Sequence, residues 1–377
     1  MVNYRLINIC KTFFSIISIN IIIIFFKFYK KKKIIFFYHP RKKLTLNHLN
    51  YLNHLFFIFK KDYLIIHGHG LENYNDKNFF FLSQSFLIKW LFNIDVFFSL
   101  NVCEKFPIRS KKIYMHHDIS TAPLVNNKNE KQLYKRLIKY DYIFIPNKKS
   151  QIMFENLFIK YKKQNSEIPK VFCVGYFKLD YLINKFKKHK NLKKQIIIAP
   201  SDYRHIKKLS ILHNLKKIIK TLLNETKYKI IFRPYPANRN SDLIQNIEKE
   251  FINEKNFMVD SSDDYFDIYS NSFCMISDIS GTAFTYAFMT NRPVIFYSKN
   301  EKNLFQLGYS HLDYFKDRKK VGLIAKDTKQ IIKNISKIKN GYNEIKKTNR
   351  KLIKEINYLG KSRKIIKKLT DNIVSIN

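Results

Sequence analysis

Residues 273–297 read FCMISDISGTAFTYAFMTNRPVIFY. Four apolar residues open this stretch, a small polar turn and a segment with helical spacing follow, and a second apolar run begins after Pro293. This order predicts a strand, a tight loop, a helix and a second strand. Such a unit leaves unpaired backbone N–H groups and the positive end of the helix dipole at the carboxyl edge of a parallel sheet, where anions bind.

The polar turn of this stretch supplies candidate residues for a phosphate site. Gly281 lets the backbone approach a phosphate, and the hydroxyls of Ser280 and Thr282 can cap the helix or donate to phosphate oxygens. Ser277 and Asp278 precede them, and we expect Asp278 to hydrogen-bond backbone or a ribose hydroxyl rather than a phosphate. The same residues also suit an ordinary capped helix without a ligand, so both interpretations stay open at this point.

Short apolar runs that end in polar or proline-marked turns recur on both sides of this stretch, with helical segments between them. Strands that alternate with helices predict an α/β protein with parallel sheets covered on both faces. We therefore expect two Rossmann-like domains, joined near the Lys- and Asn-rich segment 185–194. The expected parts are a membrane-associating N-terminal segment at 1–33, an acceptor-side domain at 34–188, a nucleotide-donor domain at 189–325 and a basic helical tail at 326–377.

The composition excludes a disordered chain and argues against nucleic acid as a specific partner. The chain has 377 residues, of which 45% are hydrophobic, and a formal net charge of +41. Lys is spread over the predicted helices rather than gathered with Arg and aromatic residues in one patch. An anionic membrane surface is the partner that this charge favours. The four cysteines are scattered without metal-ligand spacing, and we expect them to be reduced in a cytosolic protein.

The N-terminal apolar run extends from Phe13 to Phe26 and is followed by Lys27 and Lys30–Lys33. It is shorter than the roughly 20 residues that a spanning helix needs. No small-residue cleavage site follows it, so we do not expect a signal peptide. We expect an anchor that lies in the membrane plane or inserts shallowly, with the basic flank keeping the chain in the cytoplasm. A buried helix of the first domain is the alternative.

Histidines form two candidate clusters in the first half. His116-His117-Asp118 follows a predicted strand, and a histidine beside a carboxylate can act as a general base. His67 and His69 flank a glycine after another predicted strand and are candidates for the acceptor side. A surface pair and a polar turn are the respective alternatives.

The third cluster is Arg233-Pro-Tyr-Pro236, at the end of a predicted buried strand. An arginine in such a place needs an anionic partner, so we expect a phosphate or carboxylate there, with an internal salt bridge as the alternative. The signatures GxxxxGK[ST], HExxH, GxSxG and GxGxxG are all missing from the sequence.

Together these residues resemble a known family. Arg233-Pro-x-Pro236, then Ser277-Asp278-x-Ser280-Gly281, an aromatic-rich helix and Pro293-Val-Ile-Phe296 are similar to the pattern of the CDP-glycerol glycerophosphotransferases of wall and capsule polymer synthesis. The resemblance covers roughly residues 110 to 300. It implies the two-domain GT-B fold with a central cleft, a metal-independent active site with no other cofactor, and a peripheral enzyme on the cytoplasmic face of the bacterial inner membrane.

The resemblance also implies roles for individual residues. His117 matches the family's proposed base, Arg233 matches the arginine of the Arg-x-His-Pro motif, and Ser280 with Gly281 matches the loop that holds the donor diphosphate. Tyr235 stands where the family has a second histidine, and no acid lies between Thr282 and Tyr286. These departures leave another nucleotide-activated polyol or a sugar open as the donor.

The resulting hypothesis is a transferase of teichoic-acid-like polymer synthesis. An acceptor hydroxyl, on a polymer or lipid-linked acceptor, is deprotonated by His117 with Asp118 orienting the ring, and it attacks a CDP-linked donor. Arg233, Tyr235 and the turn at Ser280 bind that donor. The alternatives are a nucleotide-sugar glycosyltransferase of the GT-B fold and a non-catalytic basic protein that binds membranes or nucleic acid.

Overall fold

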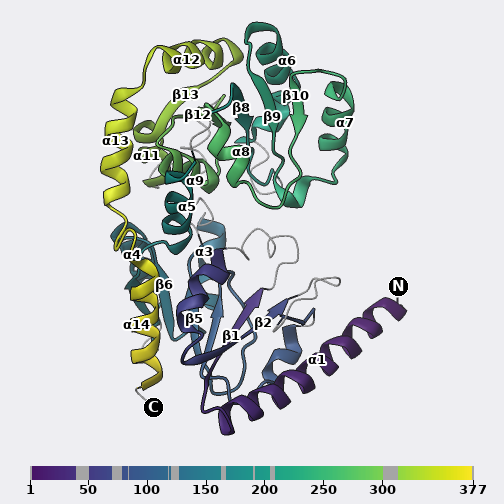
Figure 1. Cartoon of the computed structure of the whole chain (residues 1–377), viewed down its shortest axis with the longest axis vertical. Coiled ribbons are helices and arrows are strands. Elements are labelled where there is room, and N and C mark those ends of the chain that lie inside the picture. The colour runs from purple at the N-terminus through teal and green to yellow at the C-terminus, as the bar shows by residue number, and fades with distance from the viewer. Residues whose placement is uncertain are drawn as a thin grey trace. The chain divides into compact units, whose positions relative to one another are not determined.

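The computed structural model describes residues 2–39, 51–69, 79–83, 85–117, 119, 127–162, 167–189, 192–203, 209–299 and 313–375 (Figure 1). The chain divides into two compact units. Unit 1 comprises Met1–His117, Asn129–Lys178 and Asn357–Asn377, and unit 2 comprises Asp118–Lys128 and Leu179–Ile356. Each unit contains one parallel sheet with helices, so the predicted fold class is confirmed.

Unit 1 holds a seven-stranded sheet in the order β3-β2-β1-β4-β5-β6-β7, in which every pair is parallel. The chain starts at β1, moves outward through β2 to β3, and returns to add β4 on the other side of β1. The strands are β1 (Lys33–His39), β2 (Tyr63–His69), β3 (Phe79–Phe81), β4 (Val96–Ser99), β5 (Lys111–Met115), β6 (Tyr142–Ile145) and β7 (Lys170–Cys173). Its helices are α1 (Val2–Phe28), η1 (Phe57–Phe59), η2 (Ser85–Trp90), α3 (Asn127–Leu137), α4 (Lys148–Tyr161) and α14 (Ser362–Ser375).

Unit 2 holds a six-stranded parallel sheet in the order β10-β9-β8-β11-β12-β13. Its strand order reverses between β8 and β11, which is where open α/β sheets bind ligands. The strands are β8 (Gln195–Ile198), β9 (Lys229–Phe232), β10 (Phe257–Val259), β11 (Cys274–Ser277), β12 (Val294–Tyr297) and β13 (Gly322–Ala325). The helices are η4 (Ile211–Asn214), α6 (Leu215–Glu225), η5 (Pro236–Asn238), α7 (Asp242–Phe251), α8 (Phe266–Asn271), α9 (Gly281–Thr290), α11 (Asp313–Val321), α12 (Thr328–Asn340) and α13 (Asn343–Lys354), while α5 (Phe177–Lys187) begins in unit 1.

Residues 273–297 form β11, α9 and β12, as predicted. All residues of α9 from Ala283 to Thr290 are buried, which explains its apolar and aromatic composition. The helix ends at Asn291, which adopts a left-handed conformation with a φ of 53°. Asn349 of α13 donates from Nδ2 to the carbonyl of Ala287 (2.8 Å), so α13 helps to hold the end of α9.

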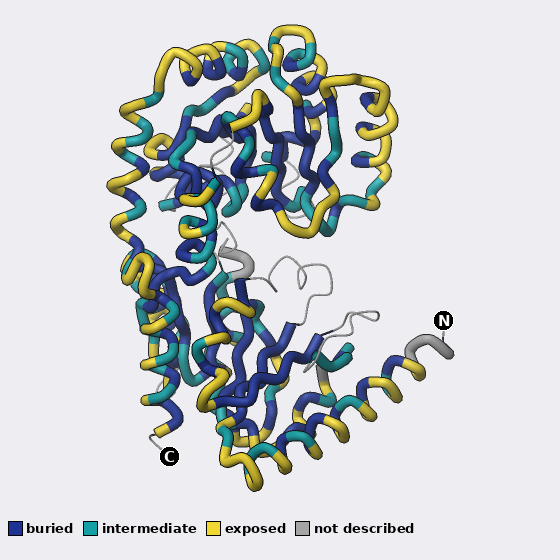
Figure 2. Tube along the Cα trace, viewed as in Figure 1, coloured by how far each residue is buried: buried dark blue, intermediate teal, exposed yellow. Residues whose placement is uncertain are grey.

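The N-terminal apolar helix α1 is longer than predicted. It runs over 27 residues, and its part Leu6–Phe28 is long and apolar enough to cross a membrane by length and composition. The residues before Phe13 continue the same helix, so it is longer than the predicted apolar run Phe13–Phe26. One face of α1 packs on unit 1 through Ile16, Ile19 and Ile23, and much of the rest is exposed (Figure 2).

The C-terminal residues 326–377, expected as one tail, are divided between the two units. Helices α12 and α13 belong to unit 2, where α12 buries Ile331, Ile335 and Ile338. Helix α14 belongs to unit 1 and is tied to it by a hydrogen bond from the Tyr63 hydroxyl to Oδ1 of Asp371 (2.8 Å). The apolar faces of these helices are the physical reason, because each needs a sheet or helix to cover it.

Candidate functional site

The loop after β11 is fastened to the loop after β8 by two buried side chains. Ser277 donates its hydroxyl to the carbonyl of Ala199 (2.6 Å). Asp278 accepts from the N–H of Ser201 (2.9 Å), the hydroxyl of Ser201 (2.8 Å) and the N–H of Ile211 (3.0 Å). As expected, Asp278 forms hydrogen bonds with backbone N–H groups. These hydrogen bonds fix the two strand ends that flank the switch point of unit 2.

Burial and hydrogen bonds act in opposite directions on Asp278. Burial raises the pKa of this carboxyl, whereas the bonds from the Ile211 N–H and from Ser201 lower it. Each of these partners donates to an oxygen of Asp278. The carboxyl is therefore part of the structural support of the loop rather than a ligand position.

The N-terminus of α9 is the part of this loop that faces outward. Ser280, Gly281 and Thr282 are all partly exposed, and Ser280 is the N-cap residue but makes no side-chain cap hydrogen bond. Its N–H donates to the hydroxyl of Tyr314 (2.8 Å), and that hydroxyl donates to the Ser280 carbonyl (3.1 Å). A buried tyrosine of α11 therefore positions the first turn of α9, where a phosphate would meet backbone N–H groups and the helix dipole.

Arg233 lies at the end of β9 and is buried, and its partner is internal. It forms an ion pair with Asp260, which follows β10, and Nη1 also donates to the hydroxyl of Ser262 (3.2 Å). The internal salt bridge that the sequence left open is therefore present. The guanidinium also lies 5.7 Å from the ring centre of Tyr265. Tyr235, two residues further on, is partly exposed at the start of η5.

A pair of tyrosines connects Arg233 to the first turn of α9. The rings of Tyr265 and Tyr269 are 4.5 Å apart, and the hydroxyl of Tyr269 lies 2.6 Å from Oγ1 of Thr282. Burial raises the pKa of Tyr269 to about 12, so its hydroxyl stays protonated at neutral pH. The structure thus brings Arg233 and Thr282 into one cluster at the carboxyl edge of the unit 2 sheet.

In unit 1, His117 follows β5 and is held in one orientation. Its Nδ1 lies 2.7 Å from the carbonyl of Leu100, which follows β4, and its own carbonyl accepts from the hydroxyl of Tyr176. Since a carbonyl only accepts, Nδ1 carries a proton, and Nε2 of the neutral ring then has the lone pair that a general base needs. Asp118 lies outside the described residues.

His67 and His69 lie inside β2, which corrects the expectation that they follow the strand. The strand continues because His67 and His69 pair with β3 on one side and with β1 on the other. Burial lowers the pKa of His67 to about 3 and that of His69 to about 4, so both rings are neutral at physiological pH. His39, at the end of β1, stacks on His67 with ring centres 5.9 Å apart and was not singled out by the sequence analysis.

Residues 111–370 match the family model described as CDP-Glycerol:Poly(glycerophosphate) glycerophosphotransferase. The chain belongs to this family. It is therefore a transferase of the CDP-glycerol-dependent class, as predicted, and the non-catalytic alternative is set aside. A comparison with curated proteins gave no match.

The fold of this glycerophosphotransferase is similar to those of several solved structures. The wall teichoic acid polymerase TagF gives a TM-score of 0.62 at 18% identity, covering 92% of this chain and 90% of that chain. A variant of TagF soaked with CDPG gives 0.64 at 16% identity, with 92% and 90% covered. The UDP-GlcNAc 2-epimerase of Methanocaldococcus jannaschii, in complex with UDP-GlcNAc and UDP, gives 0.55 at 14% identity, with 90% and 99% covered. These likenesses confirm the predicted GT-B type of fold.

Several residues around the site of this glycerophosphotransferase carry no sequence signal. Tyr314 comes 34 positions after Ser280, in a basic helix that no motif marks. Arg239 donates to the carbonyls of Ser261 (2.6 Å) and Ser262 (3.0 Å), which fixes the loop after β10 beside Arg233. In the described part of the chain, no group of three or more His, Cys, Asp or Glu side chains is placed to hold a metal ion.

Proposed function

We propose that this enzyme moves glycerol phosphate from CDP-glycerol to a hydroxyl of a polymer or lipid-linked acceptor, in the synthesis of a teichoic-acid-like surface polymer. Membership of the family and the likeness to TagF support the reaction class and the polymer. The position of the donor site is inferred mainly from the first turn of α9. Its partly exposed Ser280, Gly281 and Thr282 lie at the switch point of unit 2, where backbone N–H groups and the helix dipole favour a diphosphate.

In this reaction the acceptor oxygen forms a bond to the β-phosphorus of CDP-glycerol. The bond from this phosphorus to the oxygen that bridges the two phosphates breaks, and CMP leaves with that oxygen and its electron pair. The acceptor's proton passes to Nε2 of His117, which the Leu100 carbonyl orients through Nδ1. The N-terminus of α9 stabilises the negative charge that develops on the leaving phosphate.

Arg233 and Tyr235 are the further proposed donor ligands. In the described part of the chain, both hydrogen bonds of the Arg233 side chain use Nη1, which leaves its other nitrogens as donors for a phosphate oxygen. Asp260 then holds the guanidinium in place, since the ion pair is buried and the flat group has few orientations. Tyr235 can donate a hydrogen bond to a phosphoryl oxygen but cannot offer the charge of an imidazolium.

We further propose that α1 docks the enzyme on an anionic membrane surface, at the cytoplasmic face. The exposed face of α1 is apolar, with Phe14 at 67%, Ile21 at 62% and Phe28 at 69% exposure. The opposite face is held on unit 1 by Asn20, which donates to the Trp90 carbonyl (3.0 Å), and by the ion pair of Lys27 with Asp95 (3.1 Å). A helix with one face held by the protein and the other apolar suits a position in the membrane plane.

A donor screen with the His117→Ala variant tests the proposed chemistry. CDP-glycerol at 100 times its dissociation constant should raise the free energy of unfolding by about 2.7 kcal/mol in both wild type and variant, with CDP-ribitol and UDP-GlcNAc as comparison donors. The variant should lose turnover by on the order of 100-fold or more, because proton transfer is removed while donor binding remains. His54→Ala, at an exposed histidine of unit 1, is the control. Transfer by His117→Ala at the wild-type rate, or no stabilisation by any CDP-linked donor, would overturn the proposal.

A further inference from the structure

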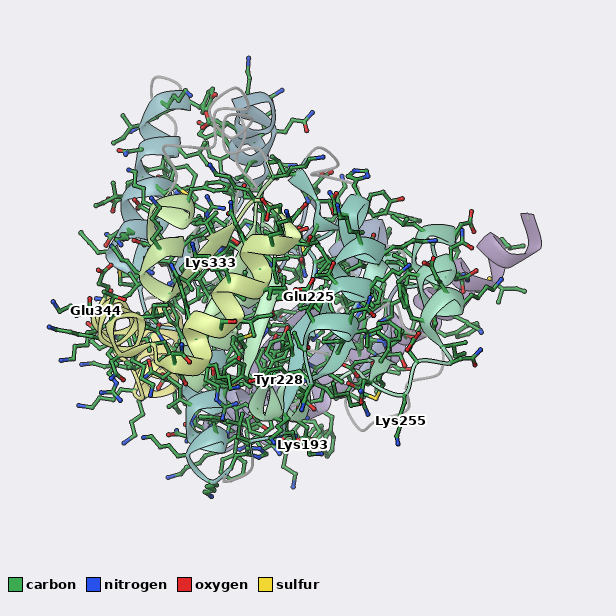
Figure 3. The ribbon with its side chains drawn as sticks, turned by 90° about the horizontal axis from the view of Figure 1, so that it is seen from above. Lys193, Glu225, Tyr228, Lys255, Lys333 and Glu344 are labelled. Atoms are coloured by element: carbon green, nitrogen blue, oxygen red, sulfur yellow. The ribbon has the colours of Figure 1, made fainter. Side chains whose placement is uncertain are left out.

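Helix α13 carries five cations on one exposed face. Lys346, Arg350 and Lys354 follow one another at intervals of four residues, and Lys347 and Lys351 form a second row beside them. At 3.6 residues per turn the five positions fall within about 140° of the helix circumference. Other lysines of unit 2 are carried by many separate elements, as Figure 3 shows for Lys193, Lys255 and Lys333.

The opposite face of α13 is fixed within unit 2. Leu352 is buried, and Asn349 donates to the Ala287 carbonyl (2.8 Å) and to Oδ1 of Asn291 (2.9 Å). The hydroxyl of Thr348 donates to the Lys320 carbonyl of α11 (2.6 Å). The cationic rows are therefore presented by an element whose orientation in its unit is set.

These cations lack the carboxylate partners that their neighbours have. Among the residues that the structure describes, no carboxylate lies within ion-pair distance of the five side chains. On the adjacent α11, by contrast, Lys316 pairs with Asp313 (3.8 Å) and Lys320 pairs with Asp317 (2.7 Å). Like charges on one face repel one another, and the row of Lys346, Arg350 and Lys354 has no acidic residue three or four positions away, so a bound polyanion would relieve that repulsion.

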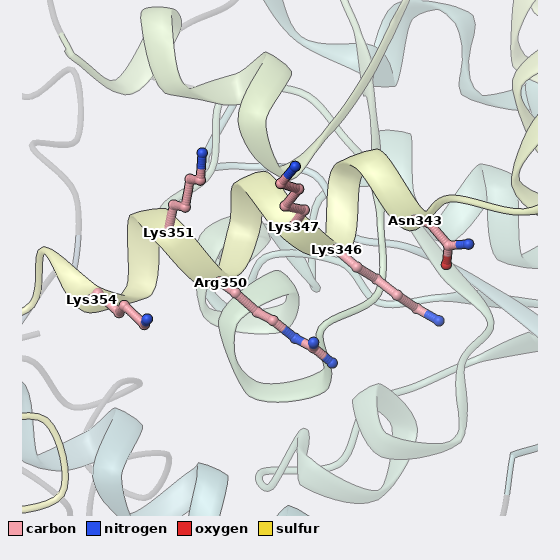
Figure 4. A pocket seen from close by; sticks show the side chains of 6 residues that line it. All are labelled: Asn343, Lys346, Lys347, Arg350, Lys351 and Lys354. Atoms are coloured by element: carbon pink, nitrogen blue, oxygen red, sulfur yellow. The ribbon is translucent and has the colours of Figure 1, made fainter.

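The hollow between the rows is open rather than closed. It has a volume of about 470 Å³ and is lined by the five cations and Asn343, all from the same helix. Figure 4 shows the side chains of Lys347 and Lys351 pointing to one side of α13 and those of Lys346 and Arg350 pointing to the other. A surface of this shape suits an extended chain more than a compact small molecule.

The spacing of the rows matches one kind of extended anion. Successive cations four residues apart are separated by about 6 Å along the helix axis. In a polymer of glycerol phosphate, successive phosphorus atoms are joined by six bonds, and an extended chain covers about 7 Å over six bonds, twice the reach of one residue. Each cation of a row can therefore meet a successive phosphate of such a polymer.

A lipid surface fits this face less well. Surfaces that dock on membranes combine cations with exposed apolar side chains, as the outer face of α1 does. None of the described side chains of α13 is an exposed large apolar group, since Ile345 and Ile353 are partly covered and Leu352 is buried. The face offers charge and hydrogen bonds alone.

We propose that the exposed face of α13 binds the growing phosphodiester polymer, with two rows of cations along successive phosphates. This inference rests on the proposed function for the identity of the polymer. Binding away from the reacting hydroxyl would keep a long acceptor on the enzyme between additions. The face would then raise the affinity for the polymer and the length of the product, and it would leave donor binding unchanged.

The test compares two triple variants of the full chain. The first variant lacks one row of cations on α13, because it combines Lys346→Gln, Arg350→Gln and Lys354→Gln. The control variant removes three exposed cations at the same spacing from α12, by Lys329→Gln, Lys333→Gln and Lys337→Gln. The probes are a labelled oligomer of ten glycerol phosphates and phosphatidylglycerol vesicles. We expect the α13 variant to bind the oligomer at least tenfold more weakly with a reduced salt dependence, and the control to change less than twofold.

Each other outcome counts against the inference. Equal losses in both variants would mean that net charge alone attracts the oligomer, and wild-type affinity in the α13 variant would mean that α13 does not bind it. Loss of vesicle binding with oligomer binding retained would assign the face to a membrane. Stabilisation by CDP-glycerol is measured in parallel, so that failure of the donor site is seen separately from failure of this surface.

Discussion

At the scale of single residues, Asp278 supports the loops of the site and does not itself contact substrate. It accepts hydrogen bonds from Ser201 and Ile211, on two different elements, while buried at the switch point of unit 2. Asp278→Asn turns one of its oxygens into an NH₂ group that faces N–H donors. We expect the free energy of unfolding to fall by about 3 kcal/mol, measured by urea denaturation. Asp242→Asn, on the exposed first turn of α7, should change it by less than about 0.5 kcal/mol; similar values for the two variants would contradict this account.

The buried histidines of unit 1 predict a loss of stability in mild acid. The pKa of His67 is lowered to about 3 in the folded chain, against about 6.5 when unfolded, so the unfolded state binds more protons between these values. Stability is therefore complete above about pH 6.5 and declines as the pH falls toward 3, by about 1.4 kcal/mol per pH unit for this group. His67→Phe, which can still stack on Phe79, should reduce that slope by this amount in denaturant titrations at several pH values. An unchanged slope would show that His67 does not carry the effect.

At the scale of elements, the turn after β7 depends on the absence of a side chain. Gly175 has a φ of 82°, and a Cβ there would collide with the carbonyl of Asn357 and lie 2.9 Å from Cβ of Ser362. Gly175→Ala should therefore destabilise unit 1 by about 3 kcal/mol or more, because strain and collision add. Gly360→Ala has a similar φ of 78° but meets nothing within 4 Å, and it should cost about 1 to 2 kcal/mol. Equal midpoints of thermal unfolding for the two variants would contradict the collision.

Most of the sheet was predictable from the sequence because buried parallel strands are short apolar runs bounded by turn residues. The miss in β2 has a clear physical cause. The continuation of β2 through His67 and His69 depends on pairing with β3, which is only the three residues Phe79–Phe81. Pairing between strands overrides local composition, and local composition is all that a single sequence displays.

At the scale of the whole molecule, motif residues were easier to predict than the residues that position them. Ser280 and Arg233 follow strands, and the family pattern marks them, so their places at the sheet edge could be predicted. Tyr314 reaches Ser280 from a helix far along the chain, and no spacing rule connects the two. The same holds for Asp260, whose pairing with Arg233 requires β9 and β10 to be neighbours.

We expect α1 to attach the whole enzyme to a membrane. Phe14→Glu with Ile21→Glu places two charges on its exposed face, which should reduce cosedimentation with phosphatidylglycerol vesicles at least tenfold, because burial of each apolar side chain contributes about 1.5–3 kcal/mol. Ile159→Glu with Ile252→Glu, at positions 71% and 68% exposed on α4 and just after α7, is the matched control and should bind like wild type.

A helix that lies in the membrane plane should also release from vesicles at high salt, since Lys30, Lys31 and Lys33 add electrostatic attraction. Retention through high salt and alkaline extraction would instead show that α1 spans the bilayer, which would require the contacts of its Asn20 with Trp90 and of its Lys27 with Asp95 to be given up.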